Sequence, residues 1–189
     1  MKRLSNLVGM KRKVRGEELG VRSNTSHLTP HAPPIKVIVQ YALSQRDLPG
    51  EAEIIRWARA ALEGRRGTVT VRIVDEQEGA ALNLSYRHKP GATNVLSFPF
   101  EPPVGVASSV QDYLGDIIIC APLVAREAQQ QHKSGEAHWA HMVVHGCLHL
   151  AGYDHQHEAE ARTMEALETR IMNKLSYPDP YLEHELQNL

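Results

Sequence analysis

Three histidines lie within eleven residues in the C-terminal part of the chain, at a spacing that suits one metal ion. His145 and His149 are four residues apart, so on a helix they share one face, about one turn apart. Gly152 permits a positive φ and ends the helix, and the resulting turn brings His155 back toward the other two. Three neutral imidazoles with an open fourth position are the usual protein share of a catalytic zinc site. The sequence therefore predicts that His145, His149 and His155 bind one metal ion.

The spacing H-x-x-x-H-x-x-G-x-x-H is also the ligand pattern of the metzincin peptidases. In those enzymes a Glu follows the first His directly and serves as general base for the zinc-bound water. Here that position is Gly146, which has no side chain and cannot transfer a proton. A metzincin-like metallopeptidase remains an alternative, but the sequence favours a metal site with different chemistry.

Other residues in this region are candidates that must be weighed against the three histidines. His141 precedes His145 by one turn, but it is eight residues, about 12 Å, from His149 on a helix, so it is expected to be packed or to support the site. Cys147 lies about 200° around the helix from His145 and is expected to be a small packed side chain. His132, His138 and His157 are expected to be solvated.

Four segments of the chain form a recognisable set: LNLSYRHK (residues 82–89), TNVLSFP (93–99), LGDI (114–117) and HGCLHLAGYDH (145–155). Together they resemble the YbeY family of bacterial single-strand-specific metallo-endoribonucleases that act in rRNA maturation. The resemblance extends over about residues 35–185, and the histidine segment is very specific. The chain departs from the family pattern after Lys89, where Pro90 stands in place of a frequent Asp.

The resemblance implies a function and roles for two further residues. It implies an endoribonuclease of 16S rRNA 3′-end maturation and ribosome quality control, with one zinc ion, or nickel, as cofactor. Arg87 is then the catalytic residue beside the metal, where its planar fork can hold two phosphoryl oxygens, and Lys89 is a substrate-binding contact to a phosphate. The implied partners are single-stranded precursor rRNA, the small ribosomal subunit and an assembly GTPase. A non-catalytic ribosome assembly factor with a structural metal is a further alternative.

Two carboxylates near these segments are candidates for orienting a metal-binding histidine. Asp116 and Asp154 could each accept a hydrogen bond from the free ring N–H of a histidine ligand, a common arrangement around protein metals. Either could instead cap a turn.

Length, composition and charge place the site in one soluble domain. The 189 residues are 42% hydrophobic, which is ordinary for a globular domain, and no apolar run approaches the roughly 20 residues that span a bilayer. The two cysteines give no disulfide framework, which fits a cytoplasmic location. Residues 1–34 carry seven basic and two acidic side chains and are expected to be a disordered basic extension. Residues 35–189 are expected to form the metallo-endoribonuclease domain.

Hydrophobic periodicity and turn residues predict the elements that position the histidines. Strands are expected at residues 35–41, 68–74, 93–100 and 113–120, and helices at 51–63, 80–86, 122–131, 137–151 and 157–175. Mixed connections without a strict βαβ repeat favour an α+β fold, with a mixed four-stranded sheet packed with helices. The metal site then lies on the fourth helix and the turn after it.

Overall fold

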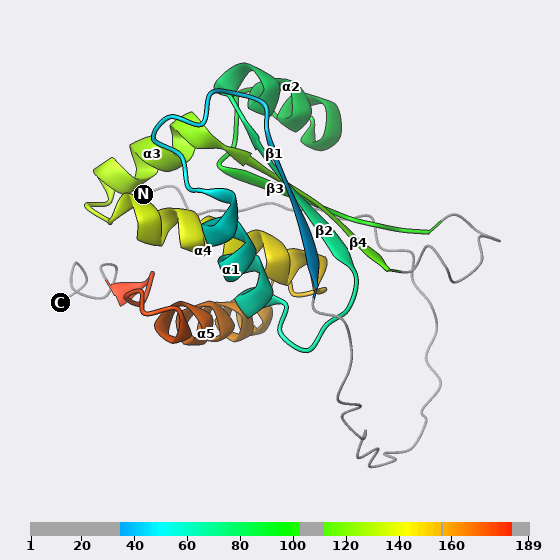
Figure 1. The fold of residues 1–189 in the computed structure, drawn as a ribbon, viewed down its shortest axis with the longest axis vertical. Coiled ribbons are helices and arrows are strands. Elements are labelled where there is room, and N and C mark those ends of the chain that lie inside the picture. The colour runs from blue at the N-terminus through cyan, green and yellow to red at the C-terminus, as the bar shows by residue number, and fades with distance from the viewer. Residues whose placement is uncertain (1–34, 103–111, 156, 183–189) are drawn as a thin grey trace, which may run out of the picture.

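The computed structural model describes residues 35–102, 112–155 and 157–182 of the chain (Figure 1). The expected basic extension, residues 1–34, lies outside the described residues. Within the described part of the chain, no helix is both long and apolar enough to cross a membrane.

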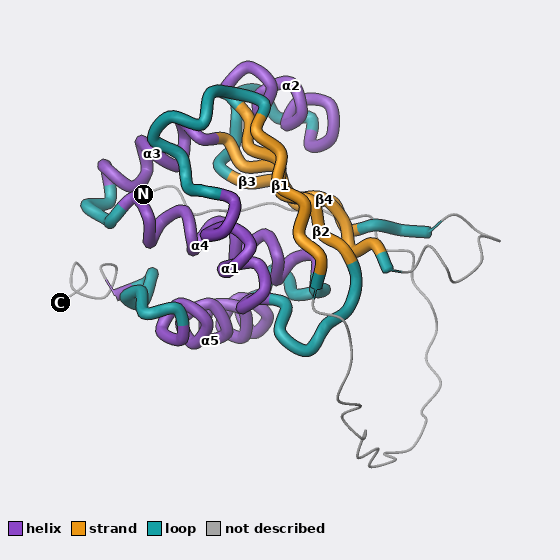
Figure 2. Tube along the Cα trace, in the orientation of Figure 1, coloured by secondary structure: helices purple, strands orange, loops and turns teal. Residues whose placement is uncertain are grey.

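A four-stranded mixed sheet forms the centre of the molecule (Figure 2). Its strands are β1 (Lys36–Tyr41), β2 (Thr68–Val74), β3 (Val95–Pro99) and β4 (Tyr113–Cys120). They lie in the order β1-β2-β4-β3, with β1, β2 and β4 parallel and β3 antiparallel to β4. The expected single α+β domain is confirmed, and β3 is an edge strand.

Helices cover both faces of this sheet. They are α1 (Glu51–Ala61), α2 (Glu76–Arg87), α3 (Ala121–Gln130), α4 (Gly135–Leu150) and α5 (Glu158–Lys174). Figure 1 shows α1, α4 and α5 on one side of the strands and α2 on the other. Along β4, Ile117 and Ile119 belong to the large core under α1, α4 and α5, whereas Ile118 packs with Leu82 of α2. The run of apolar residues in β4 therefore reflects burial on both faces.

Helix α4 lies in the interior of the molecule, so most of its polar side chains are buried as well. Thirteen of its 16 residues are buried, because it packs against the sheet and against α1, α3 and α5. Buried polar groups need hydrogen-bond partners, since leaving one unpaired is unfavourable by about 1–3 kcal/mol. The histidines of α4 are therefore expected to find specific partners on neighbouring elements.

Helix α2 begins four residues earlier than the sequence predicted. The Asp75 carboxylate accepts the backbone N–H of Glu78 at 2.8 Å, which satisfies one of the free donors of the first turn. His88, with φ of 54°, ends the helix in the left-handed region. The polar first turn carries no apolar periodicity, and for that reason the pattern placed the start of the helix too late.

Candidate metal centre

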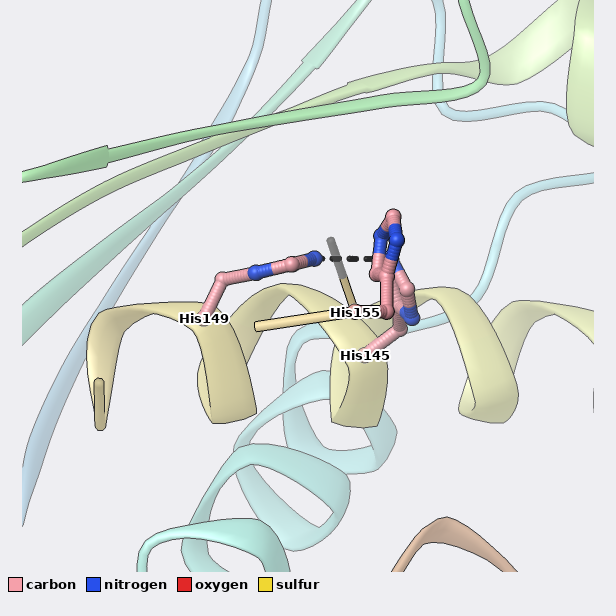
Figure 3. Close-up of side chains that lie close together, drawn as sticks. All are labelled: His145, His149 and His155. Atoms are coloured by element: carbon pink, nitrogen blue, oxygen red, sulfur yellow. Dashed lines mark hydrogen bonds between the residues drawn. The ribbon is translucent and has the colours of Figure 1, made fainter. Parts of the chain in front are cut away.

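The rings of His145, His149 and His155 lie together on one side of α4 (Figure 3). Each offers a nitrogen, and these ligand atoms all lie within 4.8 Å of one another. The Nε2 atoms of His145 and His149 are 3.1 Å apart. The ring of His155 has its centroid 5.0 Å from that of His149 and 5.6 Å from that of His145. The structure thus brings together all three predicted ligands.

The turn after α4 carries His155 back to the helix. Gly152 has φ of 92°, and the N–H of Tyr153 donates to the carbonyl of Leu148 at 3.0 Å, as in a Schellman motif. The carbonyl of Tyr153 then accepts the Nδ1–H of His149 at 3.0 Å. One turn therefore places the third histidine and also leaves the Nε2 lone pair of the second facing the cluster.

A carboxylate on α5 performs the same task for His145. Glu168 is fully buried, and its Oε1 accepts the Nδ1–H of His145 at 2.7 Å. The two expected carboxylates have other partners: Asp116 accepts from the hydroxyl of Tyr113, and Asp154 from the backbone N–H of His155. Glu168 was not predicted from the sequence to take part in the site.

These hydrogen bonds decide whether the three residues fit a metal ion. With both Nδ1 atoms donating elsewhere, the facing Nε2 atoms of His145 and His149 present two lone pairs to each other. Two nitrogens bound tetrahedrally to zinc at about 2.0–2.1 Å would be about 3.3 Å apart, close to the 3.1 Å observed. The donor set therefore fits a zinc-like cation with three imidazole ligands.

The electrostatics of the cluster favour the protonation states that a metal site needs, namely a neutral imidazole as ligand and an ionised carboxylate beside it. Burial, reinforced by the neighbouring His145 and His155, lowers the pKa of His149 to about 4, so this imidazole is neutral near pH 7. For Glu168, burial by itself raises the pKa of the carboxyl, but the hydrogen bonds from His141 and His145 and the electrostatic attraction to both side chains together outweigh it. The pKa of Glu168 is thereby held below its usual range, and the carboxylate is ionised.

The remaining candidates of α4 have structural partners. His141 is buried, and its Nε2 donates to Oε2 of Glu168 at 3.0 Å. Burial raises the pKa of the Cys147 thiol, which packs in the core as expected. The prediction that His138 is solvated was wrong: it is 3% exposed and meets Glu127 of α3 at 3.0 Å.

Gly146 packs against the sheet with no space for a side chain. A Cβ atom at this position would lie 2.7 Å from Cγ2 of Ile117 and 3.3 Å from Oγ of Ser97. Ordinary carbon contacts are about 3.5–4.0 Å. The position that carries the base in metzincins is thus occupied here by helix–sheet packing, which argues against the peptidase alternative.

Arg87 and Lys89 come from the other side of the sheet, at the C-terminal end of α2. The ring of Tyr86 packs edge-on against Phe98 of β3, with centroids 4.9 Å apart. Ser97, which precedes Phe98 and lies on the opposite face of β3, donates its hydroxyl to the carbonyl of Gly146 at 3.3 Å. Edge strand β3 therefore connects the end of α2 to the helix that carries the histidines.

Hydrogen bonds from a buried side chain fix the loop that follows Arg87. The buried side chain of Asn83 donates to the carbonyls of Lys89 and Gly91, at 3.2 and 2.8 Å. Arg87 is partly buried, and burial lowers the pKa of its guanidinium. A cation that has lost part of its water interacts more strongly with a nearby anion.

The fold and this cluster define a single-domain α+β protein with a group of three histidines that could hold a metal ion. The model of the family Endoribonuclease YbeY matches residues 41–176. An Endoribonuclease YbeY of Nitrosococcus oceani is 54% identical over 149 residues, which are 78% of this chain and 97% of that protein. One of Methylococcus capsulatus is 57% identical over 136 residues, 72% of this chain and 89% of that protein.

The chain belongs to the YbeY family, as its sequence motifs indicated. It is therefore an endoribonuclease, a hydrolase of phosphodiester bonds in RNA.

Proposed function

We propose that this protein is a single-strand-specific, metal-dependent endoribonuclease that acts on precursor 16S rRNA near its 3′ end, in the cytoplasm, and serves ribosome quality control. In this proposal His145, His149 and His155 hold one zinc ion, with nickel as the alternative metal. The small ribosomal subunit and an assembly GTPase are its proposed partners. The observation that carries the proposal is the pair of Nε2 atoms 3.1 Å apart, with both Nδ1 atoms engaged elsewhere.

Hydrolysis of a phosphodiester requires an activated water and stabilisation of the charge that develops on the phosphoryl group. His145, His149 and His155 would hold the zinc ion, and the ion would supply a Lewis acid that makes water acidic enough to act as a nucleophile near pH 7. The side chain of Arg87 supplies the second positive group, and its two-pronged fork suits two phosphoryl oxygens. Lys89 provides a point charge for a neighbouring backbone phosphate. The need for a strongly basic side chain would then be smaller, which fits a glycine at position 146.

The first experiment measures metal content and RNA cleavage in the same preparation. Purified protein is analysed for zinc and nickel and is incubated with a labelled precursor of the 16S 3′ end, single-stranded or annealed to a complementary strand. We expect about one ion per chain, cleavage of the single strand, and loss of cleavage on chelation without unfolding. Cleavage that survives removal of the metal would refute the metal-dependent mechanism. A metal-loaded protein that never cleaves RNA would favour the assembly-factor alternative.

Substitution of single histidines tests the ligand set. Replacing His145, His149 or His155 by Ala should sharply reduce the bound metal. His141→Ala is the comparison variant. It removes a buried imidazole of the same helix whose hydrogen bond goes to Glu168 and not to the three proposed ligands. It should therefore affect the metal only through Glu168 and keep most of it at saturating zinc, unlike the three ligand variants. Full occupancy in His155→Ala would show that the third ligand is assigned wrongly.

Arg87→Ala separates stabilisation of charge from metal binding. The variant should keep its fold and its metal, because a guanidinium offers no lone pair to a cation. Loss of one preorganised donor typically lowers a rate about 10²–10³-fold, and Arg87→Lys should recover only part of this. Single-turnover cleavage at saturating enzyme separates the chemical step from weak RNA binding. An unchanged single-turnover rate would reduce Arg87 to a binding residue.

A further inference from the structure

Glu168 is the most deeply buried carboxylate among the described residues, with 0% of its surface exposed. A buried ionised carboxylate is strongly unfavourable unless hydrogen bonds compensate its lost hydration. Glu168 has three donors: the Nδ1–H of His145 at 2.7 Å, the Nε2–H of His141 at 3.0 Å, and the hydroxyl of Tyr181. They come from α4 and from the segment after α5, so this one side chain joins two parts of the fold at the metal cluster.

The contact with Glu168 determines which nitrogen of His145 can bind a metal. When a carboxylate accepts a hydrogen bond from Nδ1–H, the proton stays on Nδ1 and the lone pair is on Nε2, the atom that faces Nε2 of His149. His149 obtains the same tautomer from a backbone carbonyl, that of Tyr153. A side-chain substitution can therefore remove the partner of His145 while the main-chain partner of His149 stays in place.

The C-terminal segment holds the third donor in position. Lys133 donates from Nζ to the carbonyl of Pro180 at 2.8 Å, and Asp179 accepts the backbone N–H of Tyr181 at 2.9 Å. The ring of Tyr181 then packs edge-on against His141, with centroids 5.6 Å apart. These contacts place the Tyr181 hydroxyl on the carboxylate of Glu168.

We propose that Glu168 is a positioning residue for the metal site, which fixes the tautomer and orientation of His145, and that Tyr181 holds Glu168 in place. This inference rests on the proposed metal at His145, His149 and His155. A different chemistry must be distinguished, because donor atoms of His141, His145 and Glu168 also lie within 4.8 Å of one another and could form a second metal site. In the observed hydrogen bonds both oxygens of Glu168, Nε2 of His141 and Nδ1 of His145 have protein partners without a second ion, and Nδ1 of His141 is buried without a partner among the described residues.

Glu168→Gln is the decisive substitution, and Glu127→Gln is its matched control. The amide of Gln keeps the shape of Glu but replaces one acceptor by a donor, so His145 can no longer be held reliably with its proton on Nδ1. Glu127 likewise bonds a histidine of α4, His138, at 3.0 Å, and it also accepts the side-chain amide of Asn94. Among the described residues, the hydrogen bonds of Glu127 involve none of the three proposed ligands.

The measurement is zinc affinity, by competition with a chromophoric chelator, together with the thermal midpoint of the metal-free proteins. Loss of a residue that orients a metal-binding histidine typically weakens metal affinity about 10–100-fold, and we expect this for Glu168→Gln. Glu127→Gln should bind zinc like the unmodified protein. Long-range ¹H–¹⁵N spectra of the histidine rings should show Nδ1–H for His145 in the metal-free protein and a shift toward Nε2–H in Glu168→Gln. A merely structural role would leave that tautomer unchanged.

Each outcome has one interpretation. If the unmodified protein binds no zinc, the proposed metal site fails, and this inference with it. If it binds one ion and Glu168→Gln binds as tightly as Glu127→Gln, the positioning role alone is refuted. Two ions per chain, with one lost in Glu168→Gln, would make Glu168 a ligand of a second metal. If Glu168→Gln does not fold, Tyr181→Phe decides: it keeps the carboxylate and should weaken zinc binding, and unchanged affinity would overturn the inference.

Discussion

The contact between Gly146 and the sheet leads to a quantitative prediction for Gly146→Ala. A new methyl group would lie 2.7 Å from Cγ2 and 3.2 Å from Cδ1 of Ile117. Ile117 is fully buried in the central strand β4, so neither it nor the backbone of α4 can move away without disturbing other contacts. Overpacking of this kind destabilises a protein by about 1–3 kcal/mol.

Helix propensity acts in the opposite direction and must be subtracted. Ala in a helix interior is favoured over Gly by about 0.5–1 kcal/mol, so the net loss in the free energy of unfolding should be about 0–2.5 kcal/mol. Gly79→Ala in α2 is the matched control, because its new Cβ would meet its nearest neighbours, on Ala92 and Cys120, at an ordinary 3.4 Å. That variant should be stabilised by about 0.5–1 kcal/mol.

Urea unfolding of both variants measures the difference, which should be about 1–3 kcal/mol because the propensity term cancels. Combining Gly146→Ala with Ile117→Ala should remove part of the clash, so the double variant should be less destabilised than the sum of the single ones. The reasoning would be refuted if Gly146→Ala stabilised the protein as much as Gly79→Ala does. Additive effects of the two substitutions at residues 146 and 117 would also contradict it.

Three further predictions concern the scaffold. Asp75→Ala removes the N-terminal cap of α2 and should lower the free energy of unfolding by about 1 kcal/mol, measured by urea unfolding. Trp57→Ala removes a fully buried side chain that donates to the Tyr177 hydroxyl at 3.1 Å; it should cost about 3–5 kcal/mol, and a smaller loss would mean that the core collapses around the gap. A chain that begins at residue 35 should fold and cleave RNA, with weaker RNA binding at low salt; failure to fold would place residues 1–34 in the core.

The strands were predictable because their signals are local. Alternation of Val69, Val71 and Ile73 with polar residues defines β2, and the three successive isoleucines of β4 are the local pattern of a strand that is buried on both faces. The start of α2 was misplaced because a polar first turn carries no apolar periodicity. Strand order, by contrast, depends on pairing between distant segments such as β2 and β4, and no local pattern encodes that order.

The proposed metal ligands could also be chosen from the sequence, since their geometry follows from local rules. Spacing of four residues places His145 and His149 on one helical face, and the positive φ of Gly152 turns the chain toward His155. The side of α4 that packs on the sheet was not determined locally. For this reason the burial of His138 was not predicted from the sequence. The need for a glycine at position 146 likewise became clear only from its close approach to Ile117 in the structure.

The role of Glu168 depends partly on the sequence and partly on the tertiary structure. The sequence does carry a signal, because this carboxylate lies within the apolar stripe of α5, between Met164 and Ile171. A charge at such a position must meet a buried partner, but the sequence does not say which. Only the packing of α5 on α4 brings Glu168 to His145, 23 residues earlier in the chain. Contacts across that separation depend on how helices pack against each other, and the 3.6-residue period of each helix leaves that packing open.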